Sequence, residues 1–193
     1  MILIPLIILV VIVLWFASVY NFFVTAKTRI GAAIQEIGNQ LKRQADLIPN
    51  LEASVKGYMK QEKDIFAMLT DARKAIASAA GSGNVQKMAD AGAQLNAVLP
   101  KLTIAVESNP ELKSNEVVSN LMDELRDTAD KIMYSRRLLI DLTADYNVKL
   151  VTFPTNFIAQ MFHFEAMKGL VTPDSGEFLN VSETETKTPR VNL

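Results

Sequence analysis

The chain has 193 residues, which is enough for one ordinary domain and a membrane anchor but too few for two full-sized domains. Its 20 basic and 21 acidic side chains give a net charge of -1, which excludes the strongly basic surface that gathers nucleic acid. The chain contains no cysteine, so disulfide frameworks, thiolate metal sites and cysteine nucleophiles are excluded, and the redox compartment is left open.

The N-terminal segment decides the class of protein. No charged side chain occurs before Lys27, and the apolar run from Ile2 to Val24 is longer than the ~20 residues that cross a bilayer. A secretory signal peptide would begin with basic residues and have a shorter apolar core. We therefore expect a retained transmembrane anchor over residues 1–25, in preference to a cleaved signal or a buried soluble helix. Lys27 and Arg29 follow the anchor, and the positive-inside rule then favours a cytoplasmic bundle.

Beyond the anchor, apolar residues recur at a spacing close to 3.5, which predicts long helices. One apolar stripe covers Ile30 to Leu41, and another runs from Leu51 through Tyr58 to Ile76. Pro49 predicts a break or a kink between the two, with Asn50 as the cap of the second helix. The sequence Gly-Ser-Gly-Asn at residues 81–84 predicts a reversal of the chain.

Two more helices follow. One is predicted from Val85 to Val106, with a kink at Pro100 and an end at residues 108–110. The clearest helix opens at Ser114 or Asn115 and runs to Leu150.

These elements predict an all-α protein in which the N-terminal transmembrane helix leads into an antiparallel up-and-down bundle of long helices. The bundle is expected over residues 26–169, with three principal helices, or four if the chain breaks at Pro49. The spacing favours left-handed, coiled-coil-like packing. Residues 170–193 are polar and are predicted to form a disordered tail.

A search for reactive groups predicts no catalytic, cofactor-binding or metal-binding residue. His163 is the single histidine, and without cysteine it needs carboxylates to complete a zinc site. Glu62 falls on an apolar stripe and is expected to be a buried partner of Arg136 or Arg137 on a facing helix. Residues 81–83 lack the Gly-Lys-Ser/Thr continuation of a phosphate-binding loop.

Two glycines are candidates for a close helix contact. Gly31 and Gly38 are seven residues apart and therefore share one face of a helix. Small residues on one face permit close approach of helices near the membrane, and here the approaching helix is expected to come from another copy of the chain.

Three motifs carry a family resemblance. Residues 39–51 read NQLKRQADLIPNL and residues 55–58 read VKGY, and together they closely resemble the signature of the LemA family of bacterial membrane proteins. The sequence NPELKSN at residues 109–115 resembles the inter-helix motif of that family. Tyr146-Asn147, with FPTN at residues 153–156 and FHF at residues 162–164, resembles its closing motif. The likeness spans about residues 20–165.

The resemblance implies an anchored bundle of long helices in a bacterial cell membrane and no established enzymatic activity. Members are linked to stress or envelope functions, to membrane proteases and, in one branch, to magnetosome membranes. The chain departs from the family pattern at Leu121-Met122, at residues 128–130, at Leu139-Ile140 and at Gln61-Glu62, which is typical of a divergent member.

The first of these motifs, residues 39–51, also contains four polar residues, Lys42, Arg43, Asp46 and Asn50. Either Asn50 caps a helix and Asp46 pairs locally with Arg43 or Lys42, or the four residues form an interaction patch for a partner protein.

We expect a non-enzymatic assembly or adaptor protein that acts in the lipid bilayer with copies of itself or with another membrane protein, without nucleic acid, cofactor or small-molecule substrate. The alternatives are a carboxylate-based metal enzyme around Glu62 and a membrane-remodelling bundle whose aromatic residues at 20–23 and 153–164 meet lipid.

Overall fold

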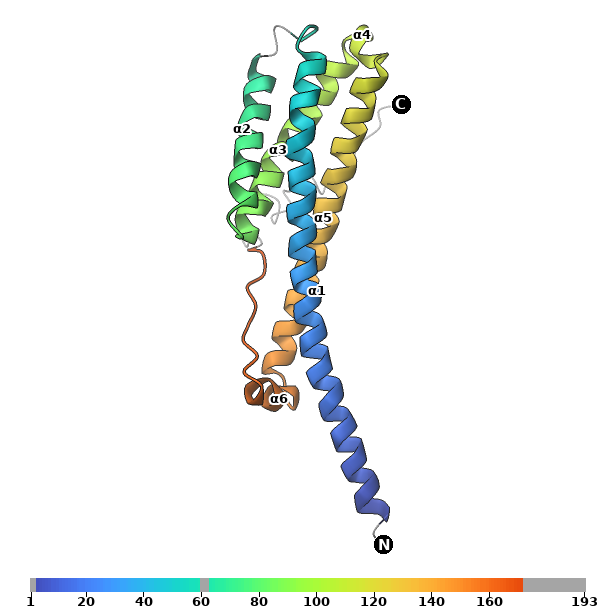
Figure 1. The fold of residues 1–193 in the computed structure, drawn as a ribbon, viewed down its shortest axis with the longest axis vertical. Coiled ribbons are helices and arrows are strands. Elements are labelled where there is room, and N and C mark those ends of the chain that lie inside the picture. Colours follow the sequence, from blue (N-terminus) through green and yellow to red (C-terminus); the bar gives the residue numbers. More distant parts are fainter. Residues whose placement is uncertain (1–2, 60–62, 172–193) are drawn as a thin grey trace, which may run out of the picture.

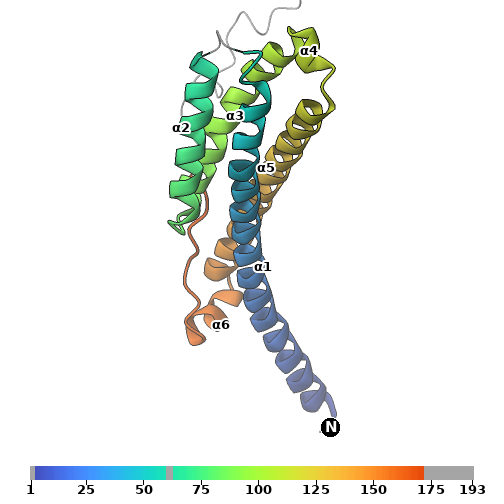
Figure 2. The same ribbon diagram turned by 45° about the horizontal axis from the view of Figure 1, so that its top comes forward.

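The computed structural model describes residues 3–59 and 63–171. Over these residues all regular secondary structure is helical. The elements are α1 (Leu3–Val55), α2 (Lys63–Ala80), α3 (Val85–Glu107), α4 (Pro110–Lys113), α5 (Glu116–Val151) and α6 (Thr155–Met161). The four long helices run alternately up and down (Figures 1 and 2), which confirms the antiparallel bundle on an N-terminal apolar helix.

Asparagine side chains open three of the helices. The side chain of Asn84 accepts a hydrogen bond from the backbone N–H of Lys87 at 3.1 Å, and Asn109 and Asn115 cap α4 and α5 in the same way. Such caps satisfy N–H groups that have no partner inside the helix. Asn115, and not Ser114, therefore begins α5. The predicted reversal at residues 81–84 is also found, and Gly83 takes the positive φ of 63° that suits glycine.

Of the two alternatives left open at Pro49, the continuous helix forms and the break does not. Helix α1 continues through Pro49 to Val55, and Asn50 lies inside the helix, where its carbonyl accepts a hydrogen bond from Ser54 Oγ at 2.8 Å. A proline removes one helical hydrogen bond, but Ile48 and Leu51 on either side are fully buried, and this packing holds the helix together. Pro100 likewise lies inside a continuous α3.

The chain instead turns at residues 56–59, around Gly57. The predicted stripe from Leu51 to Ile76 therefore belongs to two helices, and its member Tyr58 is 47% exposed in the turn. The apolar spacing keeps its phase across the turn because both helices face the same core. The bundle has four long helices, but the break is not at Pro49.

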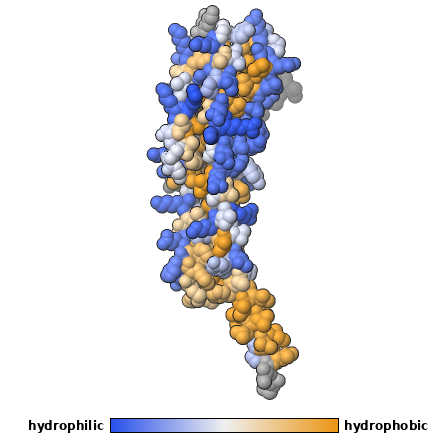
Figure 3. Space-filling model, viewed as in Figure 1, coloured by the Kyte–Doolittle hydropathy of each residue, from blue (hydrophilic) through white to orange (hydrophobic). Residues whose placement is uncertain are grey.

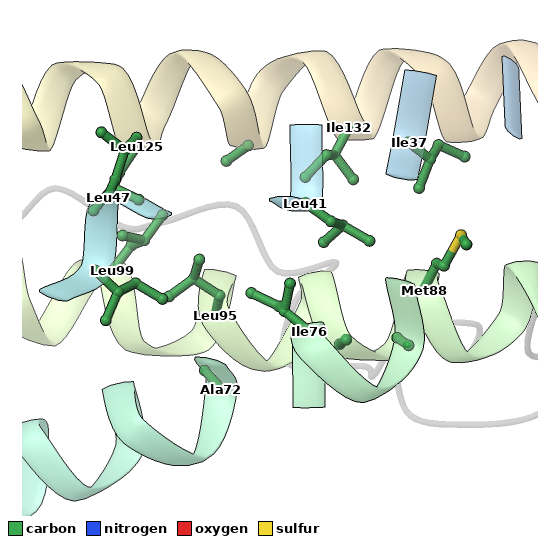
Figure 4. Packing of buried hydrophobic residues seen from close by; sticks show 14 of the residues in the cluster. Ile37, Leu41, Leu47, Ala72, Ile76, Met88, Leu95, Leu99, Leu125 and Ile132 are labelled. Atoms are coloured by element: carbon green, nitrogen blue, oxygen red, sulfur yellow. The ribbon is translucent and has the colours of Figure 1, made fainter. Parts of the chain in front are cut away.

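The core of the upper bundle is formed by aliphatic side chains from α1, α2, α3 and α5 (Figure 4). Leu41 of α1 and Ile132 of α5 approach α3 at Gly92, where a Cβ atom would lie 3.4 Å from Leu41 Cδ2 and 3.6 Å from Ile132 Cγ2. The missing side chain of Gly92 thus lets three helices meet closely.

Helices α2 and α3 accompany only the upper half of the α1–α5 pair (Figure 1). Below them, residues 164–171, which we call the return segment, run from α6 back to the base of α3. Phe164, Met167 and Leu170 of this segment pack against the core, and the backbone N–H of Val171 donates to Gln86 Oε1 at 3.0 Å. The packed chain therefore extends past the predicted bundle end at residue 169, while the rest of the predicted tail, 172–193, lies outside the described residues.

Candidate functional site

The N-terminal part of α1 stands clear of the bundle. From Leu3 to Leu14 the large apolar side chains are 50–70% exposed, and they form the apolar end of the molecule in Figure 3. Only 6% of the most apolar 18-residue window of α1 is buried, which disfavours a core helix of a soluble protein. Helix α1 is therefore a candidate membrane span by the length and composition of its N-terminal half.

An aromatic cluster joins the upper part of this apolar helix to α5 and to the end of α6. Phe23 is fully buried; its ring stacks on Phe164 with centroids 4.9 Å apart and meets Tyr146 edge-on at 5.5 Å. One turn lower, Tyr20 contacts Phe162 at 4.7 Å, and Phe16 contacts Phe162 at 5.8 Å. Offset and edge-to-face contacts of this kind stabilise a core beyond the area they bury. The cluster therefore packs the upper part of the apolar stretch of α1 against the lower end of the bundle.

The family-motif residues Tyr146 and Asn147 hold this cluster together. Burial raises the pKa of the Tyr146 hydroxyl, and the negative charge of Glu165 raises it further. The side chain of Asn147 donates to the carbonyl of Met167 at 2.8 Å and accepts from the N–H of Met167 at 3.0 Å. The closing motif thus fixes the return segment to α5. We call this pair of hydrogen bonds the Asn147 lock.

A groove runs along the outer face of α1 and α5 above the aromatic cluster. Its volume is about 680 Å³, and small or apolar residues line its floor, among them Ala32, Ala33 and Leu138. Tyr134 stands at the edge with 69% of its surface exposed. The charged residues of the rim are Arg29 and Glu36 on α1 and Asp130 and Lys131 on α5. Two positive and two negative charges around an apolar floor suit a protein contact better than a charged ligand.

The predicted polar patch lies on one exposed face of α1. Lys42, Arg43, Asp46 and Asn50 are at least partly exposed, but Arg43 forms its ion pair with Glu124 of α5, at 2.7 Å, and not with Asp46. Both partners are about half exposed, so the pair contributes little to stability. The cap predicted at Asn50 does not form, and the role of the patch as an interaction surface remains a prediction.

The two glycines of the predicted contact face have different surroundings. A Cβ atom at Gly38 would lie 3.9 Å from Met88 of the same chain, whereas a Cβ at Gly31 would meet nothing within 4 Å. Gly38 therefore faces α3 inside the bundle, and only Gly31 remains open to another helix. Glu62 lies outside the described residues; of its predicted partners, Arg136 is half-buried and Arg137 is exposed.

A buried polar residue does occur in α1, at a position that the sequence analysis did not select. Gln44 is fully buried, and neither its Nε2 nor its Oε1 has a hydrogen-bond partner within residues 3–59 and 63–171. The spacing of the apolar residues could have identified Gln44 as a core position, because it continues the four-three alternation between Leu41 and Ile48. The groove was missed as well. Tyr134, a large side chain that lies off the core stripe of α5, marked its edge.

Among the described residues, no three His, Cys, Asp or Glu side chains are grouped so that they could hold a metal ion. A comparison with curated proteins found no match. The sequence model of the LemA family matches residues 33–192, which is most of the chain. The match begins at Ala33, beyond the apolar end of α1, and includes the two helix-capping asparagines at 109 and 115 and the lock between Asn147 and Met167.

Proposed function

The chain belongs to the LemA family, and on this premise we propose that it is a non-enzymatic assembly or adaptor protein, anchored in the membrane by α1. We propose further that it associates with copies of itself through the α1–α5 groove. The observation that carries the proposal is the groove itself, an apolar trough with a mixed-charge rim on a bundle that emerges from a candidate membrane span.

The composition of the groove and its surroundings supports a protein partner. Tyr134 and Met133 are 69% and 62% exposed, and Ile104 on the neighbouring face of α3 is 68% exposed. Aromatic side chains and methionine are enriched at protein interfaces, and clustered apolar side chains on a polar surface mark interaction sites. A protein partner would bury these side chains together with the alanine floor of the groove.

The heights of the rim charges favour a second copy as that partner. The Arg43–Glu124 ion pair marks the register of α1 against α5. Seven residues, or two helical turns, lead from Arg43 to Glu36 and from Glu124 to Lys131, so these two residues lie at the same height.

Two copies anchored in one bilayer are parallel and meet at equal heights. Under a two-fold axis along the membrane normal, the α1 edge of one copy faces the α5 edge of the other. Glu36 of each copy then faces Lys131 of its partner, and opposite charges meet twice. Confinement in the membrane raises the effective concentration of the two copies, so a modest interface suffices.

The test measures energy transfer between copies in vesicles at fixed protein-to-lipid ratios. Because the chain has no cysteine, one dye can be attached at Lys74→Cys, an exposed position on α2. Tyr134→Asp is expected to weaken association about tenfold or more, as a central aromatic contact does. The matched control, Val117→Asp, changes an apolar residue that is 60% exposed on the same helix outside the groove, and it should have no effect.

A charge exchange tests the geometry. Glu36→Lys and Lys131→Glu are each expected to weaken association, and the double variant is expected to restore it. Absence of energy transfer in the unaltered protein would overturn self-association, and a cross-link from the groove to another membrane protein would then identify the adaptor role. Equal effects of Tyr134→Asp and Val117→Asp would remove the groove from the interface.

The carboxylate-metal alternative is not favoured. The LemA family is not known as a family of enzymes, and Glu62, on which this alternative rests, lies outside the described residues.

A further inference from the structure

Two stretches that are far apart in the sequence lack charged residues, and they lie at the same height along the molecule. Along α1 none occurs before Lys27, and from Leu150 to Phe164 there is again no Asp, Glu, Lys or Arg. The two stretches lie side by side, because Phe16 and Tyr20 contact Phe162. Lys149 marks the common upper limit, with its Nζ 3.7 Å above the ring of Phe22.

The second stretch has an apolar outer surface. We call residues 151–162, which include α6, the α6 foot. Four of its large side chains point away from the protein: Val151, Phe153, Phe157 and Met161 are 73%, 74%, 59% and 62% exposed. Figure 3 shows an apolar surface at this base of the bundle, beside the place where α1 emerges. A soluble surface seldom exposes so many large apolar groups together.

The charge-free stretch of α1 decides what covers this surface. It continues past Trp15 to Phe22, which lies at the height of Lys149. At 1.5 Å of rise per residue, the stretch from Leu3 to Phe22 is about 30 Å long, which matches the ~30 Å hydrocarbon core of a bilayer. A span whose upper limit is set by the first charges therefore places the residues from Phe16 to Phe22, and with them the α6 foot that packs on them, below the membrane surface.

We propose that the α6 foot is inserted in the bundle-side leaflet of the bilayer, next to α1, with Val151, Phe153, Phe157 and Met161 in contact with lipid acyl chains. This inference rests on the anchoring role of α1 proposed above. The membrane contact of the protein is then one complete helix together with a short helical foot from the other end of the chain.

Several polar groups of the foot, although not Asn156 Oδ1, are paired within the protein. Polar groups that cannot reach water must find partners within the protein. Thr152 Oγ1 donates to the carbonyl of Val148 at 2.6 Å, and Thr155 Oγ1 donates to the carbonyl of Thr152 at 2.9 Å. The turn after α6 is closed by the N–H of Phe162 and the N–H of Phe164, which donate to the carbonyls of Ile158 and Ala159. Lys149 can extend its ammonium group to the headgroups, as lysines at interfaces do.

The test is tryptophan quenching in the full-length protein, reconstituted in phosphatidylcholine vesicles whose acyl chains are brominated either near the headgroup or near the chain end. Trp15 is the only tryptophan, and the unaltered protein therefore reports on α1 alone. The variant Trp15→Phe/Phe157→Trp reports on the foot. Trp15→Phe/Val117→Trp is the matched control, since Val117 is 60% exposed at the start of α5, outside both the foot and the groove.

We expect Trp15 to be quenched best by bromine near the chain end, because it lies about 10 Å below the height of Phe22. The emission of the Phe157→Trp probe is expected to be blue-shifted and quenched best by bromine near the headgroup. The Val117→Trp control should be quenched by aqueous iodide and not by brominated lipid.

Three outcomes would overturn the inference. If Trp15 is not quenched by either lipid, the span itself fails, and the foot with it. If Trp15 is quenched but the Phe157→Trp probe responds to iodide, α1 is anchored and the foot lies in water. If the same probe is shielded from both iodide and lipid, protein covers the foot, and a second copy or another membrane protein takes the place that we assign to lipid.

Discussion

Loss of the contact between Asn147 and the return segment should directly affect the membrane end of the protein. The Asn147 side chain makes two hydrogen bonds to the backbone of Met167, at 2.8 and 3.0 Å. Both hydrogen bonds are half-buried, and no other side chain of α5 bonds to the backbone of the return segment within the described residues. The variant Asn147→Ala removes both bonds and leaves the N–H and the carbonyl of Met167 without these partners.

The expected cost follows from these two bonds. Each net hydrogen bond contributes about 1 kcal/mol, so the loss of two costs about 2 kcal/mol in the free energy of unfolding. For a chain of this size 1 kcal/mol corresponds to roughly 2–4 °C in Tm, and we expect Tm to fall by about 4–8 °C.

Hydrogen exchange separates a local opening from global unfolding. The amide of Val171 bonds to Gln86 and is untouched by the substitution. If the return segment opens as a unit, 2 kcal/mol should accelerate exchange of the Val171 amide by about 30-fold. Mass spectrometry of the full-length protein in lipid nanodiscs measures this rate on the peptide that contains residues 164–171.

The control is Asp145→Ala, an exposed position two residues away on the same helix, which should change stability by less than about 0.5 kcal/mol. The reasoning would be refuted if Asn147→Ala left both Tm and exchange of the return segment at the level of the control. In that case the return segment would be held by its other contacts, and the closing motif would need another explanation.

Three further predictions concern the core. Gln44→Leu replaces a fully buried amide without partners among the described residues by an apolar side chain of similar size, and should raise stability by about 2 kcal/mol in denaturant unfolding; a loss would mean that the amide is paired. Gly92→Leu forces four additional carbons towards Leu41 and should cost about 1–3 kcal/mol by the same assay, whereas an unchanged midpoint would show that the helices can separate. The raised pKa of Tyr146 means that the folded protein holds this proton more tightly, so the stability it confers is complete below the usual tyrosine pKa of about 10 and is lost as pH rises above it. Tyr146→Phe should flatten that alkaline decline in a series of thermal melts, and an unaltered decline would assign it to other groups.

The helices were largely predictable from the sequence, because a spacing near 3.5 and three capping asparagines are local signals. Local signals also explain why a break and a continuous helix both stayed open at Pro49. The sequence rule weighs a proline against the helix alone, but Ile48 and Leu51 on its two sides are buried by other helices, and that tertiary contribution is not visible in one segment. The helix ends instead at Val55, and the turn that follows was obscured because the apolar spacing keeps its phase through it.

The surfaces were harder to predict than the elements. The apolar end of α1 was predictable from the sequence, because a membrane span must have a minimum length and no charged residues within a single segment. The groove combines Ala32 of α1 with Tyr134 of α5, and the α6 foot lies beside Phe16 although about 140 residues separate them in the chain. Such combinations depend on how the helices pair, and periodicity within one helix contains no information about its partner.

The return segment links these surfaces into one arrangement. Phe164 at its lower end stacks on Phe23 in the aromatic cluster directly above the foot, Met167 is bonded to α5 through Asn147, and Val171 reaches Gln86 at the base of α3. A foot fixed in the leaflet therefore fixes the height of α5 relative to the bilayer, because the aromatic cluster and the Asn147 lock leave no free joint between them. Self-association through Glu36 and Lys131 requires two copies to present these charges at one height, and the same lock that holds the foot meets this requirement. Loosening the return segment with Asn147→Ala should consequently weaken energy transfer between copies even though the groove, whose residues all lie elsewhere, is unaltered.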